Sequence, residues 1–209
     1  FSFFFSPHIS TIEGGLVLVN DPPYLDALRS MRAHGWVREM STRDTIASQN
    51  PGVDPRFLFA YPGYNFRPTE IGGAFGIHQL PRLEGFIKHR RELAQYFNEA
   101  FAPYEKWLVL PHEARGTRHS YFSYPITVRE AAPFTKKELQ NFLEAKGVET
   151  RQIEAGNIAQ QPAMKRLHYR AEAIPNTEYI HRNGFFFGLH TGIGKEEKEP
   201  QYSFTSLCW

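Results

Sequence analysis

Residues 1–19 read FSFFFSPHISTIEGGLVLV, and this stretch decides the fold that we expect for the chain. Two apolar segments flank a polar turn that contains Pro7 and His8, and a Glu-Gly-Gly step covers Glu13 to Gly15. The pattern predicts two strands joined by a turn, with an imidazole beside a flexible backbone at the end of a sheet. Enzymes of the α/β class build their sites at such places. Because the chain begins inside an apolar segment, we also expect it to be a piece of a longer protein.

The composition is that of a folded protein with little net charge. The chain has 209 residues, of which 41% are hydrophobic, enough for one large core or two small ones. It has 24 basic and 22 acidic residues, and a net charge of +2 predicts neither a nucleic-acid partner nor a membrane partner. No apolar run approaches the roughly 18 residues of a membrane-spanning helix. The single cysteine, Cys208, cannot form an internal disulfide, and we expect a cytoplasmic protein.

The first part of the chain predicts helices separated by a long loop. Asp21 followed by two prolines indicates a helix start, and Gly35 indicates its end. Residues 36–56 are polar and rich in turn formers, which predicts a long surface loop. Residues 57–68 are aromatic and predict an extended segment. Thr69 then caps a helix, and a longer helix follows from Leu83 to about Ala102, where the run KHRREL predicts a solvated face.

The later part predicts a small α/β subdomain of alternating short elements. The expected strands are WLVLP (107–111), YFSYPITV (121–128), VETRQIE (148–154) and FFFGLH (185–190). Between the second and third of them, Thr135 and Glu138 form a capping box for a helix that Gly147 ends. We expect two further short helices over 162–169 and 176–182. Residues 194–209 have no periodicity and predict an atypical tail.

Four stretches together resemble one protein family. They are SFFFSPHISTIEGG (2–15), GYNFRPTEIGGAFGIHQLPRLEGFIKHRREL (63–93), VETRQIEAGNIAQQP (148–162) and NTEYIHRNGFFFGLHTGI (176–193). In this order and spacing they resemble the DegT/StrS family of sugar aminotransferases, which use pyridoxal phosphate. The resemblance implies the α/β fold of aspartate aminotransferase. Residues 1–82 would then end the large cofactor-binding domain, and 83–193 would form the small C-terminal domain.

The third stretch resembles one branch of the family in particular. That branch removes the C3 hydroxyl of a 4-keto-6-deoxy nucleotide sugar, uses pyridoxamine phosphate, and has a histidine where transaminases have the lysine that binds the cofactor covalently. In this chain the lysine position falls on Pro7, which has no side-chain amine or base. His8 follows it. Either His8 is the catalytic general base, or the site has lost its catalyst and His8 is a cofactor-facing or packing residue.

The resemblance also implies the other site residues. Ser2 would bind the cofactor phosphate, and Asn65 would reach across a homodimer interface to the phosphate of the neighbouring subunit. Arg67, Asn157 and His190 would contact a nucleotide-linked keto sugar. Without the family, Asn65 is a turn residue, Arg67 is a salt-bridge partner, and His190 is a core histidine at the end of a strand. No spacing of His, Cys, Asp or Glu predicts a metal site.

The departures from the family leave three functional hypotheses open. The aspartate that pairs with the pyridine nitrogen and the residue that stacks on the ring belong to the family's first half, which this sequence does not contain. The chain is therefore expected to be the C-terminal half of a nucleotide-sugar dehydratase or transaminase. The second hypothesis is an inactive homologue that acts as a scaffold or dimer partner. The third is a free-standing module that binds a sugar nucleotide.

Overall fold

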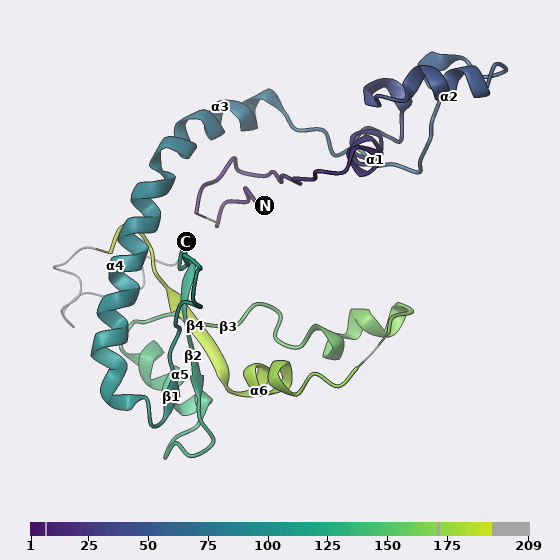
Figure 1. The fold of residues 1–209 in the computed structure, drawn as a ribbon. Coiled ribbons are helices and arrows are strands. Elements are labelled where there is room, and N and C mark those ends of the chain that lie inside the picture. The colour runs from purple at the N-terminus through teal and green to yellow at the C-terminus, as the bar shows by residue number, and fades with distance from the viewer. Residues whose placement is uncertain (7, 171, 194–209) are drawn as a thin grey trace. The chain divides into compact units, whose positions relative to one another are not determined.

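The computed structural model describes residues 1–6, 8–170 and 172–193, and the chain divides into two compact units (Figure 1). The N-terminal unit comprises Phe1–Pro81, and the C-terminal unit begins at Arg82. The tail that we expected to be atypical, 194–209, lies outside the described residues, as does Pro7.

The first residues pair as a short irregular ladder and form no regular strand within the described part of 1–19. Ser2 and Gly15 make an isolated antiparallel bridge. Phe3 N donates to Gly14 O at 2.9 Å, and Leu16 N donates to Phe1 O at 2.9 Å. The prediction of two regular strands is therefore wrong, although the two segments do pair with each other. Two strands without further neighbours are marginal in water, and among the described residues of this unit the ladder has no third member.

The first helix, α1 (Pro22–Arg32), begins as the sequence predicts. Asp21 is its N-cap, and its carboxylate accepts from Tyr24 N at 3.4 Å. The helix ends at Arg32, three residues before Gly35, which has a φ of +88°. Glycine adopts this left-handed conformation without a steric penalty, so the chain can reverse there.

Residues 36–56 are folded, so the predicted long loop is wrong. They contain the 3₁₀ helix η1 (Val37–Glu39), the α-helix α2 (Arg43–Gln49) and the start of η2 (Pro55–Phe57). A small core of Val37, Met40 and Leu58 holds this segment together. The buried carboxylate of Asp26 on α1 accepts hydrogen bonds from Ser41 and Thr42 just before α2. This tertiary packing stabilises the segment, whose apolar residues are too few to give a helical period in the sequence.

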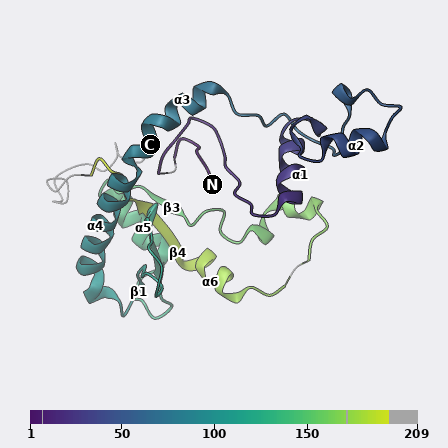
Figure 2. The same ribbon diagram turned by 45° about the horizontal axis from the view of Figure 1, so that its top comes forward.

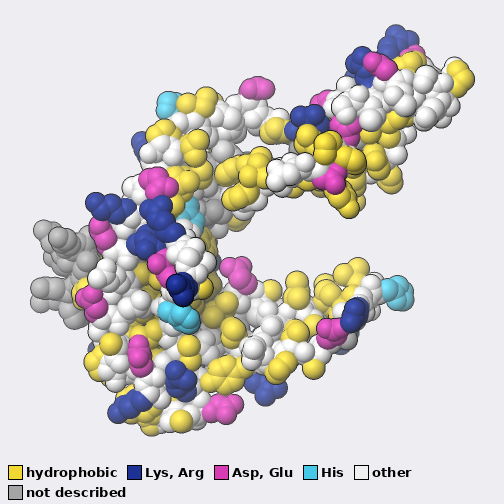
Figure 3. All heavy atoms as spheres, viewed as in Figure 1, with side chains coloured by type: hydrophobic (Ala, Val, Ile, Leu, Met, Phe, Trp, Pro, Cys, Tyr) yellow, Lys and Arg dark blue, Asp and Glu magenta, His cyan; other side chains and the backbone are white. Residues whose placement is uncertain are grey.

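No residue of the helix that follows the aromatic segment is buried within the described structure, although its Gly72 and Gly76 lie against Thr11. Thr69 occupies the N-cap of α3 (Glu70–Gln79), but its side chain makes no capping hydrogen bond. The 3₁₀ helix η3 (Leu80–Arg82) follows directly. The large apolar side chains of α3 are exposed, and hydrophobic side chains gather at the surface of the N-terminal unit in Figure 3. They include Ile71, Phe75 and Ile77.

The C-terminal unit is a four-stranded antiparallel sheet with helices packed on it. Its strands are β1 (Leu108–Val109), β2 (Ser123–Val128), β3 (Thr150–Gln152) and β4 (Gly184–Gly188), in the spatial order β1-β2-β4-β3. All four predicted strands exist, in shorter form. β4 lies between β2 and β3, so the two strands that flank the predicted helix in sequence are not neighbours.

The long helix α4 (Leu83–Phe101), followed by η4 (Ala102–Tyr104), runs beside this sheet in both views (Figures 1 and 2). Its Leu93 and Ala94 are buried, and Phe97 makes ring contacts with Tyr124 of β2 and Phe187 of β4. The Tyr124 hydroxyl donates to Asn98 Oδ1 at 2.6 Å. Tyr124 and Phe187 are register partners, so one face of the sheet carries the core.

The run KHRREL is not a uniformly solvated face, and that prediction is wrong for Arg90. Arg90 is buried, and its Nη1 donates to Phe122 O at 2.6 Å. It follows the helical spacing of Leu93 and Phe97, which places it on the inner side of α4. Lys88 and Glu92 do face solvent.

The C-terminal unit also contains two further α-helices and two further 3₁₀ helices. The capping box at Thr135 and Glu138 is present at the start of α5 (Lys136–Ala145), and Leu139 and Leu143 pack against the core. Two 3₁₀ helices, η5 (Ile158–Gln160) and η6 (Pro162–Arg166), precede α6 (Pro175–Asn183). The helix predicted over 162–169 is thus a shorter 3₁₀ turn. No helix among the described residues has both the length and the apolarity to span a membrane.

Candidate functional site

The turn that follows Ser2 is held by its own backbone and side-chain hydrogen bonds. Thr11 N donates to Phe3 O at 2.9 Å, and Ile12 N donates to Ser10 Oγ at 2.9 Å. Gly14 has a φ of +154°, and a Cβ there would lie 2.7 Å from Thr11 Oγ1. The Glu-Gly-Gly step is therefore needed for the close return of the chain, as its position in the motif indicates.

Ser2 and His8 both belong to this turn. Ser2 Oγ accepts from Phe4 N at 3.3 Å, and the residue is exposed. A hydroxyl that accepts a hydrogen bond keeps its own proton, so Ser2 can still donate to a ligand. His8 is half-buried. The roles given to Ser2 and His8 stay predictions.

Asn65 lies in an extended segment that is clamped against the end of α1. Asn65 pairs with Ala33 in an isolated antiparallel bridge. Tyr64 N donates to Met31 O at 2.7 Å, and Phe66 N donates to Arg32 O at 2.8 Å. Successive side chains of an extended segment alternate between its two sides. Tyr64 and Phe66 accordingly stack at 4.9 Å between ring centroids, which leaves Asn65 and Arg67 to share the other side.

The clamp requires glycine at two positions. A Cβ on Gly63 would lie 2.1 Å from Gly35 N, and a Cβ on Gly35 would lie 1.7 Å from Tyr61 O. Neither backbone atom can move away without breaking the bridge. The glycine of the Gly-Tyr-Asn motif is therefore required for steric reasons.

Arg67 lies in a cluster of cations and aromatic rings that the sequence analysis missed. Its Nη2 is 3.3 Å from His34 Nε2, and its guanidinium carbon is 5.9 Å from the centroid of the Trp36 ring. The guanidinium carbon of Arg38 lies 4.1 Å from the centroid of the same Trp36 ring. The Nε1 of Trp36 is buried and has no hydrogen-bond acceptor among the described residues. His34, Trp36 and Arg38 recur every second residue, a spacing that could have indicated a shared side.

Asn157 is buried and fixed by three contacts. Its Oδ1 caps η5 by accepting from Ala159 N at 3.1 Å, and its Nδ2 donates to Glu178 Oε2 at 3.1 Å. Its own backbone N donates to His181 Nδ1 at 3.1 Å. The hydrogen bond from Asn157, followed by those from Arg182 and Gln160, lowers the pKa of Glu178. Asn157 thus joins the 155–160 segment to α6, and its proposed contact with substrate stays a prediction.

His190 follows β4 in a turn of the C-terminal unit. Its side chain is half-buried, and its Nδ1 accepts from Gly192 N at 2.9 Å. Burial, followed by the charges of Arg90 and His89, lowers the pKa of His190.

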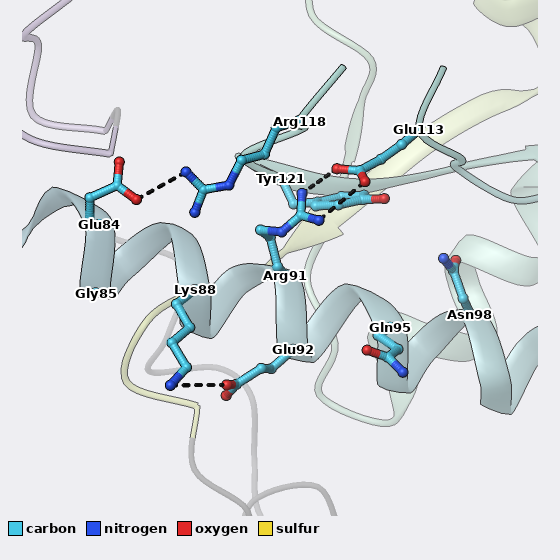
Figure 4. A pocket seen from close by; sticks show the side chains of 10 residues that line it. All are labelled: Glu84, Gly85, Lys88, Arg91, Glu92, Gln95, Asn98, Glu113, Arg118 and Tyr121. Carbon is cyan, nitrogen blue, oxygen red and sulfur yellow. Dashed lines mark hydrogen bonds and ion pairs between the residues drawn. The ribbon is translucent and has the colours of Figure 1, made fainter. Parts of the chain in front are cut away.

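A separate pocket between α4 and residues 113–121 is lined by ion pairs (Figure 4). Arg91 binds both carboxylate oxygens of Glu113, and Arg118 Nη1 lies 3.0 Å from Glu84 Oε2. Lys88 and Glu92 form a looser pair at 4.0 Å. Its three cations thus each have a carboxylate, so the pocket has no excess charge to attract an ion. Over 1–6, 8–170 and 172–193, no three His, Cys, Asp or Glu residues lie together as metal ligands.

Residues 1–200 match the DegT/DnrJ/EryC1/StrS aminotransferase family. The chain belongs to this family. The GDP-4-keto-6-deoxy-D-mannose 3-dehydratase of Yersinia pseudotuberculosis is 37% identical over 195 residues, which cover 91% of this chain and 49% of that enzyme. The dTDP-4-dehydro-2,6-dideoxy-D-glucose 3-dehydratase of Saccharopolyspora spinosa is 30% identical over 92% of this chain and 44% of that protein.

The solved structures of the family confirm the fold. An E. coli GDP-4-keto-6-deoxy-D-mannose-3-dehydratase with bound hydrated PLP superposes with a TM-score of 0.80 at 32% identity, over 99% of this chain and 53% of that one. A GDP-4-keto-6-deoxymannose-3-dehydratase variant with bound GDP-perosamine gives a TM-score of 0.78 at 33% identity, over 91% and 50%. The chain thus has part of the aminotransferase fold and spans about half the length of the relatives that it matches. These relatives belong to the 3-dehydratase branch, as the third motif indicates.

Proposed function

We propose that this chain is the C-terminal half of an enzyme that removes the C3 hydroxyl of a 4-keto-6-deoxy nucleotide sugar with pyridoxamine or pyridoxal phosphate. One observation carries the proposal. Asn65 and Arg67 alternate with the stacked Tyr64 and Phe66 in an extended segment that is hydrogen-bonded to the end of α1, in a chain that is 37% identical to a 3-dehydratase. Arg67 forms no ion pair with any described carboxylate, so its charge is available to the diphosphate of a nucleotide sugar.

The residues present fit the phosphate of the cofactor. The Ser2 hydroxyl accepts from Phe4 N and can still donate its own proton. The Asn65 side chain is exposed and has no hydrogen bond to a described residue. A hydroxyl and an amide donate to phosphate oxygens without adding a charge. When bound, the cofactor supplies an amine and a conjugated ring that can store electrons.

His8 is the general base of this proposal. An imidazole can act as a base at neutral pH, and that of His8 would take the proton at C4′ of the cofactor. Pro7, at the position of the transaminase lysine, has no amine to offer. Dehydration is therefore favoured over transamination. We further propose a homodimer, in which Asn65 of one subunit reaches the phosphate held by Ser2 of the other.

The test extends the chain to the full length of its relatives and supplies GDP-4-keto-6-deoxymannose. We expect cofactor absorbance and loss of the C3 hydroxyl. In the same background, His8→Asn should abolish exchange of the C4′ proton while cofactor binding persists. A full-length protein that binds no cofactor would contradict the enzymatic proposal.

An inactive homologue is the second candidate, and Pro7 is the observation that favours it. Such a protein would serve as a scaffold or dimer partner. The variants Pro7→Lys and Pro7→His separate the two candidates. One result would support the inactive homologue: Pro7→Lys gains the absorbance of covalently bound cofactor, while the parent protein shows no C3 deoxygenation. The cofactor pocket would then be formed, with only the catalytic side chain missing.

A further inference from the structure

A cavity of about 700 Å³ lies in the C-terminal unit where the end of β2, the start of α5 and the end of α6 meet. It lies at the end of the sheet opposite to His190. β4 begins at Gly184, which pairs with Thr127 near the end of β2, whereas its last residue, Gly188, pairs with the first residue of β2. None of the residues to which the proposed function assigns a role lines this cavity.

Cationic side chains from three separate segments line the cavity. They are Arg129, Lys136, Lys137 and Arg182. The pairing of β2 with β4 places Thr127 opposite Gly184, two residues from Arg129 and from Arg182 respectively, so both arginines lie at the same end of the sheet. Lys136 Nζ donates to the backbone oxygen of His181, the residue just before Arg182, at 3.2 Å. Like charges brought together in this way repel one another unless an anion lies between them.

The carboxylates of the lining do not pair with these cations. Glu130 and Glu138 line the same cavity. The carboxylate of Glu138 belongs to the capping box of α5, where it accepts from the backbone N and the hydroxyl of Thr135. Within the described part of the chain, Arg182 is the one lining cation with an ion pair, 2.8 Å from its Nε to Glu178 Oε1. The other three lining cations form no ion pair with a described carboxylate.

Arg129 and Lys136 keep hydrogen-bond donors that no described residue accepts. Arg129 Nε donates to Glu105 O at 3.0 Å, which leaves its two Nη groups. Lys136 Nζ donates to Gln152 Oε1 and His181 O, which are uncharged, so one of its three N–H groups remains. Guanidinium and ammonium groups are the side chains with which proteins bind phosphate. In the pocket beside α4, by contrast, each of the three cations has a carboxylate.

The cavity also has an apolar wall. Val128 and Pro133 belong to the lining, and Val128 is buried. Ala132 and Phe134 line it as well and pack, partly buried, against the core of the unit. An apolar surface beside a group of cations lowers the local dielectric constant, which strengthens the attraction for an anion. Apolar walls with a few polar groups are typical of sites for small organic molecules.

We propose that this cavity binds a small organic phosphate, whose phosphate group is held by Arg129, Lys136 and Lys137 and whose organic part lies against Phe134. The site shares no residue with the proposed function and does not depend on it. The phosphate supplies the negative charge that the three cations lack, and the apolar wall distinguishes an organic phosphate from the inorganic ion.

The first test titrates the 209-residue chain with phenyl phosphate, with inorganic phosphate and with phenol, and follows the backbone amides by ¹H–¹⁵N NMR. We expect phenyl phosphate to shift the amides of 128–138 and 182–183 and to bind at least about 3-fold more tightly than inorganic phosphate or phenol. Equal affinities of phenyl phosphate and inorganic phosphate would overturn the organic part of the proposal. No shift over 128–138 up to about 10 mM phenyl phosphate would overturn the site, even if amides near Arg67 respond.

Variants of exposed lining residues then test the phosphate contacts. Arg129→Gln and Lys137→Gln should each weaken phenyl phosphate binding about 3- to 10-fold. Arg118→Gln is the matched control, because Arg118 is an exposed arginine of the other pocket and pairs with Glu84. An equal loss in Arg118→Gln would show a general effect of net charge and contradict the site. If Arg129→Gln does not fold, Lys137→Gln decides: unchanged binding overturns the proposal, and weakened binding supports it.

Discussion

Arg67 and His34 face each other in the N-terminal unit, with Nη2 and Nε2 3.3 Å apart. A guanidinium group has no acceptor, so the imidazole Nε2 accepts this hydrogen bond. The orientation of Arg67 therefore depends on a His34 that is unprotonated at Nε2. Arg67 keeps the rest of its donors for a ligand, because it forms no ion pair with a described carboxylate.

Arg67→Gln should reduce the affinity for GDP-mannose about 10- to 100-fold, since a hydrogen bond to a charged group contributes about 1.5–3 kcal/mol. Isothermal titration calorimetry measures the change. Arg43→Gln is the control: Arg43 is an exposed arginine of the same unit that pairs with Asp44. Equal affinities of Arg67→Gln and Arg43→Gln would exclude Arg67 from the nucleotide site.

Gly63→Ala should unfold the segment that carries Asn65, because its Cβ would lie 2.1 Å from Gly35 N. Steric overlap with backbone is relieved only by moving the 63–67 segment away from α1. We expect loss of amide protection at Tyr64 and Phe66, whose N–H groups donate to Met31 and Arg32. Gly52→Ala is the matched control, since a Cβ there meets nothing within 4 Å. Unchanged protection in Gly63→Ala would refute the clamp.

Glu113→Gln should remove a part of the acid sensitivity of the C-terminal unit. The hydrogen bond from Arg91, followed by that from the His119 backbone, lowers the pKa of Glu113 to about 2. A lowered carboxylate pKa stabilises the fold above the unfolded value of about 4.3, and this stabilisation is lost as the pH falls toward the folded value. Urea midpoints measured between about pH 6 and pH 3 should therefore fall more steeply for the parent than for Glu113→Gln. Glu92→Gln, at an exposed pair, should retain the parent's slope, and identical slopes for all three proteins would contradict the prediction.

Thr135→Ala should lower the free energy of unfolding of the C-terminal unit by about 1 kcal/mol. The variant removes the hydroxyl that accepts from Glu138 N at 3.2 Å, while Glu138 Oε2 still accepts from Thr135 N at 2.7 Å. Thr135→Ser keeps the hydroxyl and serves as the control. Urea denaturation measures both variants, and a Thr135→Ser loss as large as that of Thr135→Ala would show that the methyl group, not the cap, stabilises α5.

Local patterns predicted the first helix of the N-terminal unit and the capped helix and strands of the C-terminal unit, because their signals are short-range. The capping box at Thr135 and the proline pair after Asp21 act within a single turn of helix. The alternation of residues 121–128 gives β2, whose buried residues recur every second position. Strand order did not follow from these patterns, because the placement of β4 between β2 and β3 depends on contacts far apart in the sequence.

The sequence by itself determined the family, the capped helices and the residue types of the candidate site. Tertiary structure alone decided that the buried Arg90 donates to Phe122 O, that residues 36–56 fold around Val37, and that His34 accepts from Arg67. The physical reason is the distance along the sequence over which each interaction acts. Caps and periodicity act between residues within a few positions of each other, whereas the burial of a charge and the pairing of side chains more than thirty positions apart require the whole chain to have folded.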